Sequence, residues 1–388
     1  MPIKNRFAEL HEEICAWRHD IHQNPELLFD THRTSSLVVR LLNEFGVDEV
    51  VTGIGQSGVV GVIKGKLNTS GKVIGLRADM DALPIQEATG LEYASKTEGI
   101  MHACGHDGHT AMLLGAAKYL AESRNFDGTV VLIFQPAEEG GGGGREMCQE
   151  GMMDRFNIHE VYALHNWPHI PPGEFAIRSG PFFAASDLIE ITITGKGGHA
   201  AKPQETVDTT LVASHLILAL QSIASRNVDP IEQVVVSVTS FETSSKAFNV
   251  IPERVFLRGT VRTMQPAIRD MAEKRILEMS HLTAETYGAV AEAQYIRSYP
   301  VMSNSPEQTA FAAEVATKVM GKCGEASLVM GGEDFSFMLE ERPGAYILLG
   351  NGDSAPIHTE RYNFNDEIIP AGCSWFAEIA EQRMPLER

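Results

Sequence analysis

Three short apolar runs, each bounded by glycine or by charged residues, most constrain what this chain can fold into. They are Val73–Leu76, Val130–Phe134 and Val161–Leu164, and such runs are typical of strands in a sheet that is covered on both faces. Thr110–Ala121 has the pattern of a helix, and a helical spacing of apolar residues over 10–21 predicts an opening amphipathic helix. Strands and helices in alternation predict an α/β domain.

The pattern changes near Pro181. Ile189, Ile191 and Ile193 alternate with polar residues, which is typical of a strand with one face exposed to water. The other elements expected here are the helices Thr209–Ser225 and Ile268–Tyr287 and strands around Val234–Val238 and Val255–Arg262. Two blocks of strand and helix with one-sided sheets predict a small α+β domain at 183–296.

After Tyr299 the pattern of buried strands returns. A helix is expected from Ser305–Pro306, because serine caps helices and proline starts them. A buried strand is expected at Tyr346–Leu349 and a closing helix at Ala371–Arg383. The simplest organisation is an α/β domain with a mixed sheet flanked by helices, formed by 1–182 and 297–388, which the α+β domain at 183–296 interrupts.

The overall composition excludes several classes of function. The 388 residues carry a formal net charge of −19, which argues against nucleic acid as a partner, because such binding rewards clustered lysine and arginine. No segment is long and apolar enough to span a bilayer, and the first residues lack the features of a signal peptide. Five scattered cysteines do not suggest a disulfide framework. We therefore expect a cytoplasmic protein with no membrane partner, in which a cysteine can remain a thiolate.

One cluster places a thiol, three imidazoles and a carboxylate in the nine residues 101–109. A packing role does not explain this mixture, because each unpaired polar group in a core costs free energy unless it is bonded or binds a metal. Cysteine, histidine and aspartate are ligands for zinc and related transition metals. The alternative is a polar turn that opens the following helix. The cluster is interpreted as part of a metal site with Cys104 and His106 as ligands, and its other polar residues are expected to have supporting or structural roles.

Further metal-binding residue types follow the other predicted strands. Glu138 and Glu139 follow the second apolar run, His165 follows the third, and His358 lies in a loop after a later buried strand. Ligands in α/β sheets gather at the carboxyl ends of strands. Taken singly, the two glutamates could be a solvated helix start, and a lone histidine after a strand could be a structural residue.

The ligand set expected from these segments is Cys104, His106, Glu139, His165 and His358. One thiolate, three imidazoles and one carboxylate are too many for a single tetrahedral ion with an open position. They suit a pair of ions that share a bridging ligand, and a thiolate can bridge. The soft donors favour two divalent ions of the zinc, manganese, cobalt or nickel type over magnesium or calcium.

The remaining carboxylates suggest the proton chemistry of hydrolysis. Adjacent residues at a strand end point in opposite directions, so Glu139 can bind a metal while Glu138 faces the substrate. Glu138 is therefore the expected general base, which takes a proton from water and passes it to the leaving nitrogen. Asp81 is expected to accept a hydrogen bond from a ligand imidazole and to fix its tautomer. Asp79 could do the same or approach a metal.

The inserted domain carries its own candidate residues. The turn 197–200, which contains His199, is either a hairpin tip or a functional loop, and it lacks the spacing of a phosphate loop. Asn249 is equally ambiguous alone. A substrate carboxylate needs a cation or backbone donors, for which Arg262 is a candidate, although Arg262 could equally form a surface ion pair.

The motifs, in order along nearly the whole chain, resemble the aminoacylase and hippurate hydrolase group of dinuclear metallo-amidohydrolases. That group includes the plant auxin-conjugate hydrolases and is related to carboxypeptidases. The segments that carry the resemblance are Asp79–Pro84, His102–Asp107, Glu138–Glu139, Gly197–Ala200 and Gly332–Phe335. Classical co-catalytic zinc peptidases have other residue types where this chain has Asp79, Cys104 and His165, so the chain follows the amidohydrolase subgroup.

The resemblance implies a metallopeptidase-like catalytic domain with an inserted lid or dimerisation domain. It implies the same five metal ligands, with Glu138 as the general base. It also implies that His199 of one subunit reaches the active site of a partner and helps to stabilise the oxyanion, and that Asn249 contacts the substrate. A homodimer or higher homo-oligomer is therefore expected.

The expected function is metal-dependent hydrolysis of the amide bond of small N-acyl amino acids, of the hippurate or N-acetyl type, to a carboxylate and a free amino acid. A dipeptidase or carboxypeptidase on the same dinuclear site is the alternative. A non-catalytic metal-binding protein is a more remote alternative, because a pure binder has no use for Glu138. The residues do not indicate which acyl group is cleaved.

Overall fold

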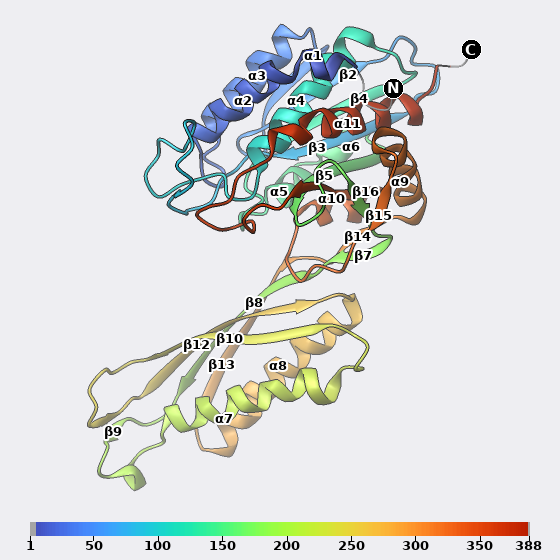
Figure 1. Ribbon diagram of the computed structural model, residues 1–388. Helices are drawn as coiled ribbons and strands as arrows, with labels where there is room; N and C mark the ends of the chain where they lie inside the picture. Colours follow the sequence, from blue (N-terminus) through green and yellow to red (C-terminus); the bar gives the residue numbers. More distant parts are fainter. Residues whose placement is uncertain (1–4, 387–388) are drawn as a thin grey trace. The chain divides into compact units, whose positions relative to one another are not determined.

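The computed structural model describes residues 5–386, and the chain divides into two compact units (Figure 1). The first unit comprises the residues up to Gly180, then Ser303–Ser327, and the residues from Asp334 onward. The second comprises Pro181–Met302 and Leu328–Glu333. The second unit is therefore somewhat longer at both ends than the insertion expected at 183–296, and it takes up a short later segment as well.

The first unit is built on an eight-stranded sheet in the order β1-β2-β4-β3-β5-β16-β6-β15. Its strands are β1 (Glu49–Ile54), β2 (Gly58–Lys64), β3 (Val73–Asp79), β4 (Thr129–Gln135), β5 (Glu160–Pro168), β6 (Phe175–Ile177), β15 (Cys323–Glu325) and β16 (Gly344–Gly352). β3 runs parallel to β4 and β5, and β16 runs parallel to β5, whereas β2 is antiparallel to both of its neighbours. The carboxyl ends of the four central strands therefore meet at one edge of the sheet.

Helices cover both faces of this sheet. They are α1 (Asn5–Glu9), α2 (His11–Gln23), α3 (His32–Glu44), α4 (His106–Ser123), α5 (Gly143–Gln149), α6 (Met152–Arg155), α9 (Pro306–Met320), α10 (Phe335–Glu341) and α11 (Ile369–Arg383), with a 3₁₀ turn η3 (Asp366–Ile368). Along β4, Val130, Leu132 and Phe134 join the core formed with α2, α4 and α11, while Val131 and Ile133 are buried on the other face. This two-sided burial explains why the strand has an uninterrupted apolar sequence.

Helix α4 is buried along most of its length because its small residues allow close packing. A Cβ atom added at Gly115 would lie 2.7 Å from Cys373 Sγ of α11 and 2.7 Å from Ile14 Cδ1 of α2. The helix begins at His106, because Gly105 has a left-handed backbone with φ of 96° that turns the preceding loop into the first helical turn. The polar run 101–109 thus ends inside the first turn of a buried helix.

The second unit contains a four-stranded antiparallel sheet in the order β10-β12-β8-β13 and a two-stranded ribbon of β9 and β11. The elements are β8 (Ala185–Thr194), β9 (Gly198–His199), η1 (Pro203–Glu205), α7 (Thr209–Ser222), η2 (Ile223–Asn227), β10 (Val234–Thr243), β11 (Val250–Ile251), β12 (Arg254–Thr263), α8 (Pro266–Thr286) and β13 (Val290–Tyr299). β7 (Gly180–Phe183) and β14 (Met302–Asn304) include the residues at which the chain passes between the units.

One face of the four-stranded sheet packs against α7 and α8. Ile189, Ile191 and Ile193 of β8 are buried in this core, whereas Leu188 and Glu190 on the other face are exposed. The alternation seen in the sequence is therefore the alternation of a one-sided sheet. Among residues 5–386, no helix combines the length and apolar composition that crossing a membrane requires.

Candidate metal centre

The first unit brings the five candidate ligands to one edge of its sheet. Glu139 follows the end of β4, His165 lies near the end of β5, and His358 lies in the loop after β16. Cys104 and His106 stand at the junction between a loop and the first turn of α4. Because the carboxyl ends of parallel strands share an edge, loops that are far apart in the sequence converge there.

These five residues form two groups that share Cys104. Ligand atoms of Cys104, His106 and His165 lie within 4.8 Å of one another, and so do those of Cys104, Glu139 and His358. Cys104 Sγ lies 3.3 Å from Nε2 of His165 and 3.3 Å from Nε2 of His358. His358 Nε2 lies 3.1 Å from Glu139 Oε1.

The spacing of these atoms suits bound cations. Two ligand atoms at ordinary distances from one tetrahedral zinc ion lie roughly 3.3–3.8 Å apart, and the two thiol–imidazole distances are 3.3 Å. Nδ1 of the buried His106 lies 3.4 Å from Asp81 Oδ1, whereas within the described part of the chain Nε2 has no hydrogen-bond partner. A buried ring nitrogen without such a partner costs free energy, and a cation would supply the missing contact. The donor set therefore fits divalent metal ions.

The carboxylates around His106 give the centre an excess of negative charge. Burial alone lowers the pKa of His106, but the neighbouring Asp79 and Asp81 outweigh burial and raise this pKa to about 10. Carboxylates that hold a proton on a buried imidazole can equally compensate the charge of a divalent cation. The electrostatics of the centre thus favour cation binding.

Burial shifts the pKa values of two other candidate ligands, Cys104 and His165, in opposite directions. Burial raises the pKa of the Cys104 thiol well above its usual range, and the charges of Glu139 and Glu138 raise it further. Burial, followed by the charge of His109, holds the pKa of His165 well below its usual range. The His165 ring is therefore neutral, and a neutral imidazole is the form that binds metals.

A backbone contact also fixes the orientation of the His165 ring. Its Nδ1 donates a hydrogen bond to the backbone oxygen of Asn166 at 2.5 Å. Because Nδ1 carries the proton in this arrangement, Nε2 is left with a lone pair that faces Cys104 Sγ. The ring thus has the tautomer that a metal ligand needs.

Asp81 holds the loop that carries Glu138 and Glu139. Its Oδ1 accepts a hydrogen bond from the backbone N–H of Glu138 at 2.9 Å, and its Oδ2 accepts one from that of Glu139 at 3.0 Å. Oδ1 also lies 3.4 Å from His106 Nδ1. One buried carboxylate therefore contacts the backbone of both glutamates and faces the imidazole of a candidate ligand.

Glu138 lies beside the candidate ligands without belonging to either group that shares Cys104. Its side chain is 7% exposed, and the ligand atoms of His106, Glu138 and Glu139 lie within 4.8 Å of one another. This is a suitable place for a general base, because the carboxylate is close to the centre and largely removed from bulk water.

The glycines that follow Glu139 are required by the path of this loop. A Cβ atom at Gly143 would lie 1.7 Å from the backbone oxygen of Pro136, and one at Gly144 would lie 2.8 Å from that of Asp334. Ala137, just before the glutamates, has φ of 54°, which is uncommon for a residue with a side chain. The loop therefore turns back tightly on its own first residues, and side chains at these positions would clash.

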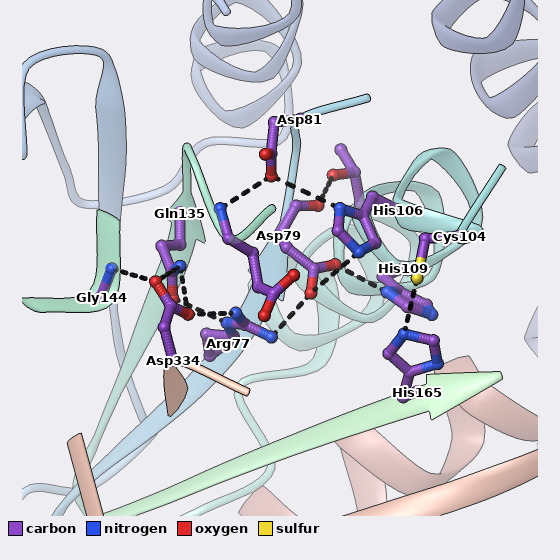
Figure 2. Close-up of polar contacts among 12 residues, drawn as sticks. Arg77, Asp79, Asp81, Cys104, His106, His109, Gln135, Gly144, His165 and Asp334 are labelled. Atoms are coloured by element: carbon purple, nitrogen blue, oxygen red, sulfur yellow. Dashed lines mark hydrogen bonds and ion pairs between the residues drawn. The ribbon is translucent and has the colours of Figure 1, made fainter. Parts of the chain in front are cut away.

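A buried ion-pair network, which was not predicted from the sequence, lies next to the centre (Figure 2). Arg77 donates hydrogen bonds to Asp79 Oδ2 at 2.7 Å, to Asp334 Oδ1 at 3.1 Å and to Gln135 Oε1 at 2.9 Å. Asp334 also accepts from Gln135 Nε2 at 2.7 and 2.8 Å and from the Gly144 N–H at 2.7 Å. The available signal was an arginine within a buried strand, because arginine is rarely fully buried unless it is paired.

His109 connects Asp79 to β5. Its Nδ1 lies 2.6 Å from Asp79 Oδ1, and its Nε2 lies 3.1 Å from the backbone nitrogen of Asn166. Burial raises the pKa of Asp79, but Arg77, His106 and His109 outweigh burial and hold this pKa well below its usual range. Asp79 is thus a carboxylate whose two oxygens both contact protein donors.

The remaining sequence candidates lie in the second unit. His199 of β9 pairs with Val250 of β11, and the Ala200 N–H donates to the backbone oxygen of Asn249, just before β11, at 3.0 Å. His199 and Asn249 therefore lie close together at one end of the ribbon. Both side chains are exposed. Arg262 of β12 is half-buried and donates a hydrogen bond to Ser186 Oγ. Burial lowers the pKa of Arg262.

The sequence profile of peptidase family M20/M25/M40 matches residues 75–382. The chain belongs to this family. This M20/M25/M40 chain is 42% identical over 383 residues to a hippurate hydrolase of Campylobacter jejuni, with 98% of this chain and 99% of that protein covered. It is 36% identical over 388 residues to thermostable carboxypeptidase 2 of Saccharolobus solfataricus, with 97% of each protein covered. The family resemblance inferred from the motifs is confirmed.

A solved structure of this M20 family agrees with the architecture described above. The YXEP protein of Bacillus subtilis, described as a dinuclear metal-binding peptidase, matches with a TM-score of 0.85 and 33% sequence identity, and 97% of this chain and 99% of that chain are covered. The α/β class with a large mixed sheet flanked by helices, which was expected from the sequence, is confirmed.

Proposed function

We propose that this protein hydrolyses the amide bond of N-acyl amino acids to a carboxylate and a free amino acid. The observation that carries the proposal is the pair of ligand groups that share Cys104, with the buried Glu138 beside them. Similarity to a hippurate hydrolase, at 42% identity over nearly the whole chain, supports a small N-acyl amino acid as the substrate.

The proposed cofactors are two divalent ions of zinc, manganese, cobalt or nickel. The residues that would hold them are Cys104, His106, Glu139, His165 and His358, and Cys104 belongs to both groups of candidate ligands. When bound, such a pair of ions polarises an amide carbonyl and acidifies a water molecule.

Glu138 is proposed to hold and move the proton. Its carboxylate accepts a proton from the water that attacks the acyl carbon. When the C–N bond breaks, the same carboxyl group gives that proton to the leaving nitrogen. Asp81 keeps Glu138 in place through the backbone N–H bond of 2.9 Å, so the base is preorganised rather than mobile.

The second unit is proposed to supply the contacts to the substrate. We assign His199 to the oxyanion in the active site of a partner subunit, Asn249 to the substrate, and Arg262 to its carboxylate. The ring nitrogen Nδ1 of His199 accepts a bond of 3.0 Å from the Ala201 N–H, which places the proton on Nε2, where a donor to an oxyanion is needed. The protein is accordingly proposed to act as a homodimer or higher homo-oligomer in the cytoplasm.

A dipeptidase or carboxypeptidase is the second candidate function, and one observation favours it. The chain is 36% identical to thermostable carboxypeptidase 2 over almost its whole length. Both functions use the same hydrolytic chemistry, so the substrate range separates them.

The first test is a substrate panel. The purified protein is loaded in turn with zinc, manganese, cobalt and nickel and assayed against N-benzoyl and N-acetyl amino acids and against dipeptides. We expect the highest kcat/KM for an N-acyl amino acid. A preference for dipeptides supports the second candidate, and no turnover with any of the four metals contradicts the proposal.

The second test is Glu138→Gln. It should lower kcat by about 100-fold to 10,000-fold, which is the usual contribution of a general base, and leave the bound metal per subunit unchanged by atomic absorption. The matched control is Glu146→Gln, which changes a partly exposed glutamate of α5 and should retain the wild-type rate. Equal activity of the Glu138 variant and the control would rule out the assigned role.

A further inference from the structure

Asp79 stands where a metal ligand could stand. Its Oδ2 lies 3.6 Å from His106 Nε2, which is close to the spacing of about 3.3–3.8 Å expected for two ligands of one tetrahedral ion. Donor atoms of Asp79, His106 and His109 lie within 4.8 Å of one another. Geometry alone would therefore allow Asp79 to join the ligand set.

Two protein donors occupy Asp79 instead. Arg77 Nη1 lies 2.7 Å from Oδ2, and His109 Nδ1 lies 2.6 Å from Oδ1. The side chains of Arg77 and Asp79 are both fully buried, and charge-assisted hydrogen bonds are strong when water is excluded. The positive guanidinium also repels any cation that approaches the same oxygen.

The other side of the same guanidinium reaches the catalytic loop. Arg77 Nη2 lies 3.1 Å from Asp334 Oδ1, and Asp334 Oδ2 accepts the Gly144 N–H at 2.7 Å. Gly144 ends the glycine run that follows Glu138 and Glu139. One arginine thus connects a carboxylate next to His106 with the anchor of the loop that carries the proposed base (Figure 2).

We propose that Arg77 is a positioning residue that keeps Asp79 out of the metal coordination and, through Asp334, fixes the loop of Glu138. The planar guanidinium suits this task because its donors diverge to two carboxylates at once, which a lysine ammonium on a single stem cannot reproduce. The inference rests on the proposed function, but metal binding tests it without any substrate.

The experiment compares cobalt binding by Arg77→Met, Arg77→Lys and Asp334→Asn with that of the wild type. Cobalt titrations give affinity and stoichiometry, and the visible spectrum of bound cobalt reports the ligand set. We expect Arg77→Met to bind cobalt about tenfold more tightly or better, a gain of roughly 1.4 kcal/mol, and to change the spectrum, because Asp79 becomes a ligand. Adding Asp79→Asn to Arg77→Met should abolish both effects.

The other two variants distinguish the effect of the Arg77–Asp79 contact from that of the Arg77–Asp334 contact. Asp334→Asn should leave cobalt affinity and spectrum unchanged, because the Arg77–Asp79 pair remains. It should lower kcat by about 100-fold with a much smaller change in KM, because a displacement of the catalytic group by about 1 Å has an effect of this size. Arg77→Lys retains the charge beside Asp79 and should keep a wild-type cobalt spectrum with a reduced kcat.

Weaker cobalt binding by Arg77→Met with an unchanged spectrum overturns the proposal, because it means that the arginine only stabilises the fold. If Arg77→Met does not fold by circular dichroism, the Asp334 and lysine variants decide. An altered cobalt spectrum in either variant, or a wild-type kcat in Asp334→Asn, overturns the proposal. If the cobalt results hold but the wild type cleaves no substrate of the panel, the proposed function fails and the role of Arg77 in metal coordination stands.

Discussion

Asp107, which follows the candidate ligand His106, keeps its charge in the core with the help of two cationic partners. Its Oδ2 lies 2.9 Å from Arg18 Nη1 and 2.8 Å from His22 Nδ1, and all three side chains are buried. His22 Nε2 faces Glu87 at 3.4 Å. Burial alone lowers the pKa of His22, but Asp107 and Glu87 outweigh burial and raise this pKa to about 9. His22 is therefore an imidazolium at neutral pH.

This pKa shift predicts a pH dependence of stability. The pKa of His22 is about 9 in the folded state, against about 6.5 for an unperturbed histidine. The contribution of His22 to stability is therefore complete below pH 6.5 and is lost as the pH rises toward 9. His22→Asn keeps an amide donor near the Nδ1 position but carries no charge. Relative to the wild type, the His22→Asn variant should lose more unfolding free energy at pH 6 than at pH 9.5. The two losses should differ by at most about 3 kcal/mol.

The measurement is urea denaturation of the metal-loaded wild type and variant across this pH range. His32→Asn, in an exposed histidine, serves as the control and should show no such pH dependence. A difference between His22→Asn and the wild type that is constant from pH 6 to 9.5 would mean that folding does not shift the pKa of His22.

Residue types could be predicted from the sequence better than their partners. The thiol, the imidazoles and the glutamate pair at the ends of apolar runs indicated a metal centre, because such groups have few other reasons to cluster. The Arg77–Asp334 bond could not be predicted in the same way, since it joins residues 257 positions apart and depends on how α10 packs. Long-range pairs of this kind leave no periodic pattern in the sequence.

Helix α5 is placed by the close approach of its first turn to Asp334. A Cβ atom at Gly144 would lie 2.8 Å from the backbone oxygen of Asp334 and 3.1 Å from its Cγ. We predict that Gly144→Ala lowers the unfolding free energy by about 1–3 kcal/mol, as overpacking usually does, and lowers kcat at least about tenfold, because the anchor of the Glu138 loop moves. Thermal denaturation and the hydrolysis assay measure the two effects.

Gly324→Ala is the matched control for this substitution. A Cβ atom at Gly324 in β15 meets its nearest neighbours only at 3.8 and 4.0 Å, so stability and kcat should stay near those of the wild type. If Gly144→Ala behaves like Gly324→Ala, the loop has more freedom than its hydrogen bonds suggest.

At the level of elements, the central strands were the most predictable part of the fold. The apolar run 130–134 corresponds to β4, Thr129–Gln135, because a strand buried on both faces must be apolar throughout. The start of α4 was expected at Thr110 and lies at His106, since buried polar residues such as those of the candidate metal centre do not follow the helical apolar pattern. The hairpin of β1 and β2 was not predicted, and β1 at the sheet edge is largely exposed, with a weak apolar pattern.

At the scale of the whole molecule, the division into two units allows the proposed role of His199 to be tested by complementation. Glu138→Gln and His199→Ala are each expected to be nearly inactive. If His199 serves the site of a partner, a mixed dimer contains one site with both residues intact, so random mixing should recover about a quarter of wild-type activity in a two-fold symmetric dimer.

The readout is the hydrolysis rate after the two inactive variants are unfolded, mixed and refolded together, with each variant refolded alone as the control. Analytical ultracentrifugation of the wild type gives the oligomeric state. Absence of any recovery in mixed dimers, or a fully active monomer, would show that His199 acts within its own chain or not at all.

The order of the proposed ligands along the chain has a consequence for biosynthesis. Cys104, His106, Glu139 and His165 precede the second unit, whereas His358 follows it. Translation proceeds from the amino terminus, and domains generally fold as they emerge. A nascent chain therefore exposes four of the five proposed ligands while the inserted unit is still being synthesised. The proposed coordination can be completed only after that unit has left the ribosome. Stable metal binding would thus occur only in chains whose translation has passed the insertion and reached the last part of the first unit.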